Sequence, residues 1–81
     1  MEPQDAVVYR IIELSLKQHM SVHQLANRSA VPPSTLKNII NGTSKNPGIV
    51  TITKLCFGLN VTLREFFGTA YMDEVEADIE D

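Results

Sequence analysis

The segment MSVHQLANRSAVPPSTLKNIIN, residues 20–41, decides how this 81-residue chain folds. It opens with Ser21-Val22-His23-Gln24, a capping box in which the serine hydroxyl and the glutamine amide satisfy each other's backbone donors. The box predicts a short helix that ends near Ser29. The pair Pro32-Pro33 disfavours helix before it and suits the first turn of a new helix after it. That second helix is predicted to stop at Asn41-Gly42, a C-terminal signal.

The register of apolar residues in this segment predicts two short helices that cross steeply. The positions where the two helices must pack together are Leu25, Ala26, Val31, Leu36 and Ile39. The other face of the second helix is polar with one positive charge, and it comprises Ser34, Thr35, Lys37, Asn38 and Asn41. Such short side chains are able to donate to or accept from base edges in duplex DNA. A merely solvated helix face has the same composition, so the face by itself leaves both interpretations open.

Three more helices are predicted outside this segment. Residues 6–19 follow Asp5, a candidate cap, and have helical spacing at Val8, Ile11, Ile12, Ser15 and Leu16. Residues 48–59 have their apolar positions at Val50 or Ile52, Leu55, Cys56 and Leu59. A second capping box, Thr62-Leu63-Arg64-Glu65, opens a short helix that ends near Gly68. With no convincing strand, the pattern predicts an all-α fold of five helices.

Length and composition limit the class of protein. Eighty-one residues suit one domain, and the 43% hydrophobic content is enough for one compact core. The single cysteine, Cys56, excludes an internal disulfide and fits a reducing cytosol. No stretch approaches the roughly 20 apolar residues of a membrane span, and the first residues do not form a signal peptide. We therefore expect a cytoplasmic protein that does not interact with membranes.

The net charge of −3 hides an uneven distribution of charged residues. Six of the ten acidic residues lie in positions 73–81, which predicts a domain at 1–70 followed by an acidic tail at 71–81. Between residues 6 and 54 the only acid is Glu13, among six basic residues. The body is therefore basic, as a nucleic-acid partner requires. The tail is either a solvated end or a segment that competes with DNA for Lys37 and Lys45.

Taken together, these motifs resemble the phage-repressor-type helix-turn-helix family, also called Cro/repressor or XRE-like. The matching stretches are residues 21–26, 31–36, 39–42 and 46–47, and the run at 52–67 resembles the family's fourth and fifth helices. The resemblance covers residues 7–68 and implies a compact, five-helix, lambda-repressor-like fold. Its helix-turn-helix would be formed by the second and third helices, and the third would enter the major groove of DNA.

The family's residue roles carry over by position. The resemblance implies that bases are read by Pro33, Ser34, Thr35 and Asn38. It implies that phosphates are contacted by Val22, His23, Gln24, Lys37, Asn41, Thr43, Ser44 and Lys45. Three features depart from the family pattern. Ala30 replaces a common turn glycine, Ser15 and Ile40 replace a buried Arg–Glu pair, and Pro33 removes an amide from the reading helix.

Large apolar residues concentrate near the C-terminal end and exceed what a small core needs. We expect some of them to form a homodimer interface, for which the candidates are Phe66, Phe67, Tyr71 and Met72, with Phe57 nearby. A two-fold dimer would address two half-sites roughly 34 Å apart on one face of the DNA.

The function that the resemblance implies is a sequence-specific regulator of transcription that binds double-stranded DNA, a repressor acting as a dimer without a cofactor. Two alternatives stay open: the antitoxin of a toxin–antitoxin pair, and a protein-interaction module that keeps the fold without reading DNA. An enzyme is not expected, because no Ser/His/Asp, Cys/His or paired-carboxylate arrangement converges on a site. His19 and His23 are four residues apart, but Ser21 starts a new helix between them, so they do not predict a metal site.

Overall fold

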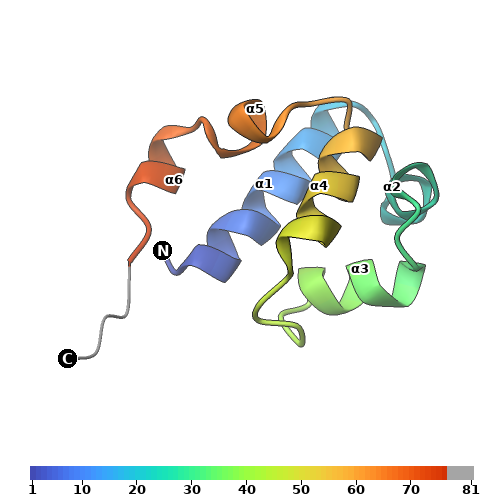
Figure 1. Cartoon of the computed structure of the whole chain (residues 1–81), viewed down its shortest axis with the longest axis horizontal. Coiled ribbons are helices and arrows are strands. Elements are labelled where there is room, and N and C mark those ends of the chain that lie inside the picture. The colour runs from blue at the N-terminus through green and yellow to red at the C-terminus, as the bar shows by residue number, and fades with distance from the viewer. Residues whose placement is uncertain (77–81) are drawn as a thin grey trace.

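Six helices and no strand form the part of the chain that the structure, a computed structural model, describes, residues 1–76 (Figure 1). They are α1 (Pro3–Lys17), α2 (Val22–Ser29), α3 (Pro33–Ile40), α4 (Ile49–Gly58), α5 (Leu63–Phe67) and α6 (Ala70–Asp73). The all-α prediction is confirmed. The expected number of helices was one too low, because the short α6 lies in the segment where we expected the acidic tail.

Helix α1 begins three residues earlier than predicted. Pro3 occupies its first turn, where a missing N–H leaves no helical bond unmade, so Asp5 lies inside the helix and is not its cap. The face that α1 buries consists of Ala6, Val7, Ile11, Leu14 and Ser15. Ile12 and Leu16, expected to point inward, are exposed instead. The prediction was wrong because α1 carries two apolar stripes, and spacing alone does not tell which one faces the core.

The two capping boxes are present as predicted. The Ser21 hydroxyl accepts from the Gln24 amide at 3.1 Å, while the Gln24 side chain accepts from the Ser21 amide at 2.9 Å. The same reciprocal pair at the start of α5 joins Thr62 and Glu65, with both distances at 3.0 Å. These bonds fix where α2 and α5 begin, because each satisfies an amide that the helix itself leaves without a partner.

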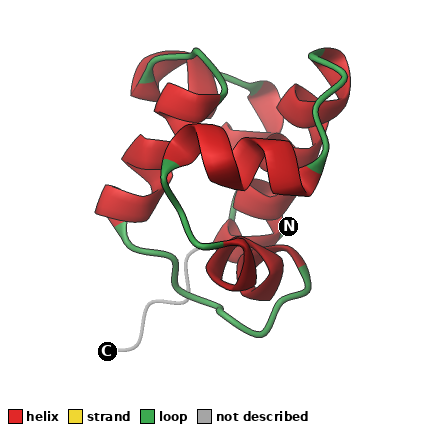
Figure 2. Ribbon diagram, turned by 90° about the vertical axis from the view of Figure 1, so that its right-hand side faces the viewer, coloured by secondary structure: helices red, strands yellow, loops and turns green. Residues whose placement is uncertain are grey.

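A residue with a left-handed backbone conformation follows each of the two helices of the helix-turn-helix. Ala30 ends α2 at φ 54°, so the alanine that replaces glycine in this turn does adopt the conformation that glycine favours. After α3, Gly42 has φ 83° at the predicted stop signal. In Figure 2 the two foremost helices are α2 and α3, and they cross steeply, with α3 seen nearly along its axis.

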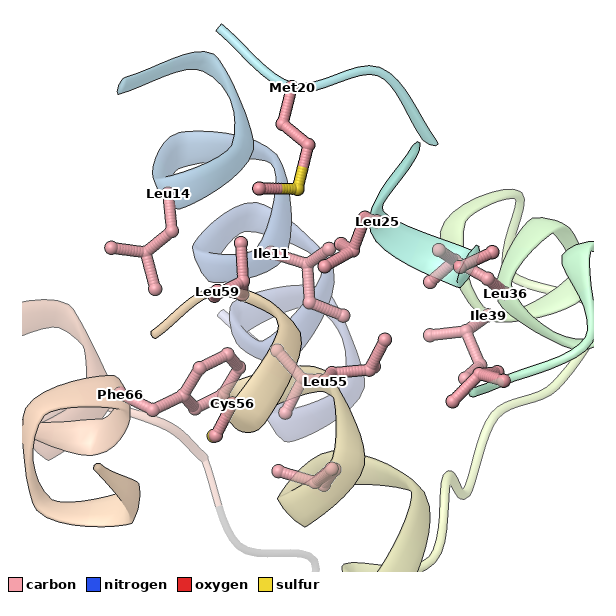
Figure 3. Packing of buried hydrophobic residues seen from close by; sticks show 14 residues of the cluster. Ile11, Leu14, Met20, Leu25, Leu36, Ile39, Leu55, Cys56, Leu59 and Phe66 are labelled. Carbon is pink, nitrogen blue, oxygen red and sulfur yellow. The ribbon is translucent and has the colours of Figure 1, made fainter. Parts of the chain in front are cut away.

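The buried residues of a single hydrophobic cluster come from all the helices except the short α6, whose Met72 packs against it. Its fully buried large side chains are Ile11, Leu25, Leu36, Ile39, Leu55, Leu59 and Phe66 (Figure 3). Ile52, not Val50, is the inward residue of the first turn of α4. Helix α2 packs most extensively against α4, where Gly58 lies directly opposite Ser29. The core thus holds α2 in place, and α2 in turn supports α3.

The C-terminal helices are tied to α1 by polar contacts. The guanidinium of Arg10 donates to the carbonyl oxygens of Phe66 and Glu65, at 2.7 and 2.6 Å, and forms an ion pair with Glu13 at 2.8 Å. The Tyr71 hydroxyl of α6 donates to the same Glu13 carboxylate at 2.7 Å. Arg10 therefore caps the C-terminal end of α5, where carbonyl oxygens lack helical partners.

Candidate nucleic-acid interface

Helix α3 exposes the polar face that the sequence predicted. Pro33, Ser34 and Asn38 are exposed and Thr35 is partly exposed, while Leu36 and Ile39 on the opposite face are buried in the core. Within residues 1–76, no intramolecular side-chain hydrogen bond engages Ser34, Thr35 or Asn38. Their donors and acceptors are therefore free to meet base edges.

The start of α2 and the start of α3 meet in a shallow hollow. Its volume is about 360 Å³ and it is lined by Val22, His23, Pro33, Ser34 and Lys37. Five residues expected to contact DNA, from two separate stretches of sequence, are thereby brought to one place. The Gln24 amide, in contrast, is already bonded to Ser21, which leaves only its side-chain NH₂ to reach a phosphate.

The loop at residues 41–48 folds back onto the other end of α3. The Asn41 side-chain oxygen accepts from the Thr43 amide at 3.1 Å, and the Ser44 amide donates to the Asn38 carbonyl at 2.9 Å. Lys45 is exposed beyond this turn. The predicted phosphate contacts thus lie at both ends of α3, and an eight-residue helix is about 12 Å long, close to the width of the major groove.

The positive charge available around α3 is smaller than the sequence suggested. Arg10 belongs to the basic body by count, but its side chain is only 14% exposed and is bound to Glu13 and to the end of α5. The exposed cations between α2 and α4 are Arg28, Lys37, Lys45 and Lys54. The Tyr71 hydroxyl and then Arg10 lower the pKa of Glu13, so this carboxylate stays ionised and keeps Arg10 engaged.

A comparison with known families identifies the domain that carries these residues. A family model described as a Cro/C1-type helix-turn-helix DNA-binding domain matches residues 10–70. The chain belongs to this family. The match extends from within α1 through α5 and includes both helices of the motif, so the resemblance and the lambda-repressor-like fold are confirmed. No curated protein and no solved structure gives a significant match.

In this Cro/C1-type chain, the residues expected to form a dimer interface lie in different environments. Phe66 is fully buried in the core, pointing from α5 toward α4 (Figure 3), so it is not available to a partner. Tyr71 is bonded to Glu13 and packs edge-on against Tyr9, and Met72 packs against the core. Phe67 alone among the four is exposed.

Three strongly exposed apolar residues lie on α4 instead. Ile49 is 61% exposed, Val50 67% and Phe57 81%. Sequence reasoning noted Phe57 near the candidate interface, gave Val50 and Ile52 as alternatives for one inward position, and did not assign Ile49. The signal that points outward applies to Val50 and Phe57, which are seven residues apart on the side of α4 opposite buried Ile52 and Leu55. Ile49 is three residues from Ile52, so its spacing gives no such signal.

Asp73 and Glu76 of the C-terminal segment lie near the start of α1. Helix α6 packs against α1, and the Glu76 amide donates to the Met1 carbonyl at 3.1 Å. Asp78, Glu80 and Asp81 lie outside the described residues.

In the part of the chain that the structure describes, no helix is long and apolar enough to cross a bilayer. The same residues contain no group of three or more His, Cys, Asp or Glu placed to hold a metal ion.

Proposed function

We propose that this protein is a sequence-specific regulator of transcription that binds double-stranded DNA and represses by occupying its operator as a dimer. The observation that carries the proposal is the face of α3, whose exposed polar side chains lie between two groups of candidate phosphate contacts. This arrangement suits a helix that enters the major groove, with phosphates fixing its position and short side chains reading bases.

Three residues of α3 are the proposed base readers. Asn38 pairs in bidentate fashion with an adenine, since its amide offers one donor and one acceptor. Thr35 contacts a thymine methyl group or a base edge, and Ser34 hydrogen-bonds at the N-terminal end of the helix. Pro33 lacks an N–H and contributes shape only.

The phosphate contacts frame these readers. The first amides of α2, at Val22 and His23, point from a helix N-terminus and attract an anion. Lys37 adds charge in the last turn of α3 and Lys45 adds charge in the loop after it, and Asn41 contributes its free side-chain NH₂. Each of these contacts strengthens binding to any sequence, so specificity depends on the readers.

The dimer that the proposal requires is supported by the apolar face of α4 rather than by Phe66. Ile49 and Val50 follow directly after the loop that carries Lys45. A two-fold contact there would hold two α3 helices at a fixed separation, as two half-sites about 34 Å apart demand. Phe67 lies at the end of α5, where it lines a hollow with Pro3, Val7 and Met72 instead of joining the α4 face.

The test of base reading compares two asparagines. A selection from random duplexes gives the preferred sequence, and a palindrome supports the dimer. Asn38→Ala should then lose about 1–3 kcal/mol at the selected site and relax one base position. Asn27→Ala, the same change on α2, should leave the preference unchanged. Equal losses by Asn38→Ala on selected and random DNA would refute its role as a reader.

Salt dependence separates this function from a protein-interaction module. If Lys37 and Lys45 each neutralise a phosphate, a dimer should give a slope of log affinity against log salt of about −3.6 or steeper. Lys45→Ala should flatten that slope by about 1.8 for the dimer and weaken all sequences alike. An interaction module would bind no duplex at any salt concentration.

An antitoxin would bind DNA in the same way, and a toxin encoded beside it would reveal that role.

A further inference from the structure

Helix α1 presents a second apolar stripe that faces away from the core. Asp5, Tyr9, Ile12 and Leu16 follow one another at spacings of four, three and four residues, which places them along one line of the helix, and His19 lies in the turn just beyond its C-terminal end. All five are exposed: Tyr9 to 54%, Ile12 to 40% and Leu16 to 69%. This pattern is that of a coiled-coil seam without its partner helix.

The stripe contains both a protrusion and a hollow. The protrusion is Leu16, the most exposed leucine of the chain among the described residues. The hollow has a volume of about 360 Å³ and is lined by Met1, Asp5, Val8, Tyr9, Ile12, Ile40, Asn41 and Gly42. Leu16 and Val8 are eight residues apart, about 12 Å along the helix. A surface with both shapes is able to complement a copy of itself.

Charge decides the orientation of such a copy. The N-terminal end of the stripe is acidic, with Glu2 and Asp5, and Glu76 lies beside Met1. The C-terminal end carries Lys17 and the His19 imidazole, which is able to donate a hydrogen bond to a carboxylate. Antiparallel packing brings unlike ends together, whereas parallel packing places acid against acid.

We propose that α1 packs antiparallel against α1 of a second copy of this chain, about a two-fold axis at Ile12. In that register Leu16 of each copy enters the hollow beside Val8 of the other, and Asp5 faces His19 of the other. The contact involves one helix from each copy, which is less than the roughly 1,600 Å² of a standard interface. We therefore expect a weak association, with a dissociation constant in the micromolar range.

This surface is distinct from the α4 face proposed for the DNA-binding dimer. Two different two-fold contacts on one chain link dimers into larger assemblies. The α1 contact would thus join dimers bound at neighbouring operators, where tethering on DNA raises their effective concentration. The proposal does not depend on whether α3 reads DNA, so it is tested on the free protein.

The first experiment measures self-association by sedimentation equilibrium without DNA. A Phe57→Glu background that also carries Val50→Glu places charges in the α4 face proposed for the DNA-binding dimer, and circular dichroism verifies the fold of each variant. In this background Leu16→Glu should weaken association at least about tenfold, because it places a charge in an apolar contact. Leu63→Glu, the same change at an exposed leucine of α5, should leave it unaltered. A chain that stays monomeric at millimolar concentration in the Val50→Glu, Phe57→Glu background would overturn the proposal.

The second experiment tests the register by charge exchange. Asp5→Lys alone places lysine against histidine, and His19→Asp alone places two carboxylates together, so each should weaken self-association. When these two variants are mixed, each heterodimer contains one Lys–Asp pair and one native Asp–His pair. The mixture should therefore associate more tightly than either variant alone, by about tenfold. No preference for the mixture would refute the antiparallel register.

Discussion

The close approach of α2 and α4 makes a sharp prediction at Gly58. A Cβ atom added at this glycine would lie 2.0 Å from the Ser29 hydroxyl oxygen and 3.1 Å from both the Cβ and the backbone nitrogen of Ser29. The hydroxyl must be displaced from its buried position, and the other two atoms move only if the helices separate. Gly58→Ala should therefore disturb the contact that holds the helix-turn-helix against the core.

Two opposing effects set the size of this change. Alanine in a helix is favoured over glycine by about 1 kcal/mol. Overpacking of a well-packed contact costs about 1–3 kcal/mol, and the upper end applies here because a backbone atom is among those approached. The net loss in the free energy of unfolding should be about 2 kcal/mol, which lowers the Tm of a domain of this size by about 8–16 °C.

Denaturant unfolding of a double-mutant cycle with Ser29→Ala is the assay. The Ser29 hydroxyl is buried and has no hydrogen-bond partner among residues 1–76, so Ser29→Ala alone should be neutral or slightly stabilising. In the Ser29→Ala background, Gly58→Ala should cost about half as much, because the nearest clashing atom is gone. A Gly58→Ala variant as stable as the wild type, or an equal cost in both backgrounds, would refute this account of the contact.

Two further predictions concern backbone strain and ionisation. Ala30→Gly should stabilise the chain by about 1 kcal/mol in denaturant unfolding, because alanine at φ 54° carries a left-handed penalty that glycine escapes; unchanged stability would contradict this strain. Tyr71→Phe should raise the pKa of Glu13 toward its ordinary value of 4.5, followed by NMR titration of the carboxyl group. Since the folded pKa of Glu13 is lowered, its stabilisation is complete above the unfolded pKa and is lost as the pH falls through the folded pKa. The Tyr71→Phe variant should therefore lose less free energy of unfolding than the wild type when the pH is lowered. A Glu13 pKa that is the same in the variant and the wild type would contradict the Tyr71 contact.

The helix-turn-helix was predictable because its signals are local. The capping box at Ser21 and Gln24 acts within four residues, and the stop at Gly42 depends on one backbone angle. The candidate DNA face follows from the same locality, since buried Leu36 and Ile39 determine which side of α3 faces outward. What was predicted well is therefore what the chain determines over one or two helical turns.

The errors arose where tertiary packing chooses between equivalent local patterns. Both stripes of α1 have helical spacing, and the core selects the one with Ile11 and Leu14. Phe66 and Phe67 are adjacent in sequence, yet the turn of α5 buries the first and exposes the second. Arg10 counts as a basic residue in any sequence, and only the folded chain shows that α5 and Glu13 hold it.

The engagement of Arg10 also bears on how the α3 face must work. With this cation bound internally, few exposed positive charges surround the reading helix, and salt-dependent attraction to phosphates is correspondingly limited. Binding to arbitrary sequences should therefore be weak, because the phosphate contacts provide most of its free energy. At the preferred DNA sequence, the base contacts of Asn38 and Thr35 then provide a larger share of the total binding free energy. A sparsely charged face gains selectivity in this way and loses affinity per subunit, and association of several copies on one DNA recovers that affinity.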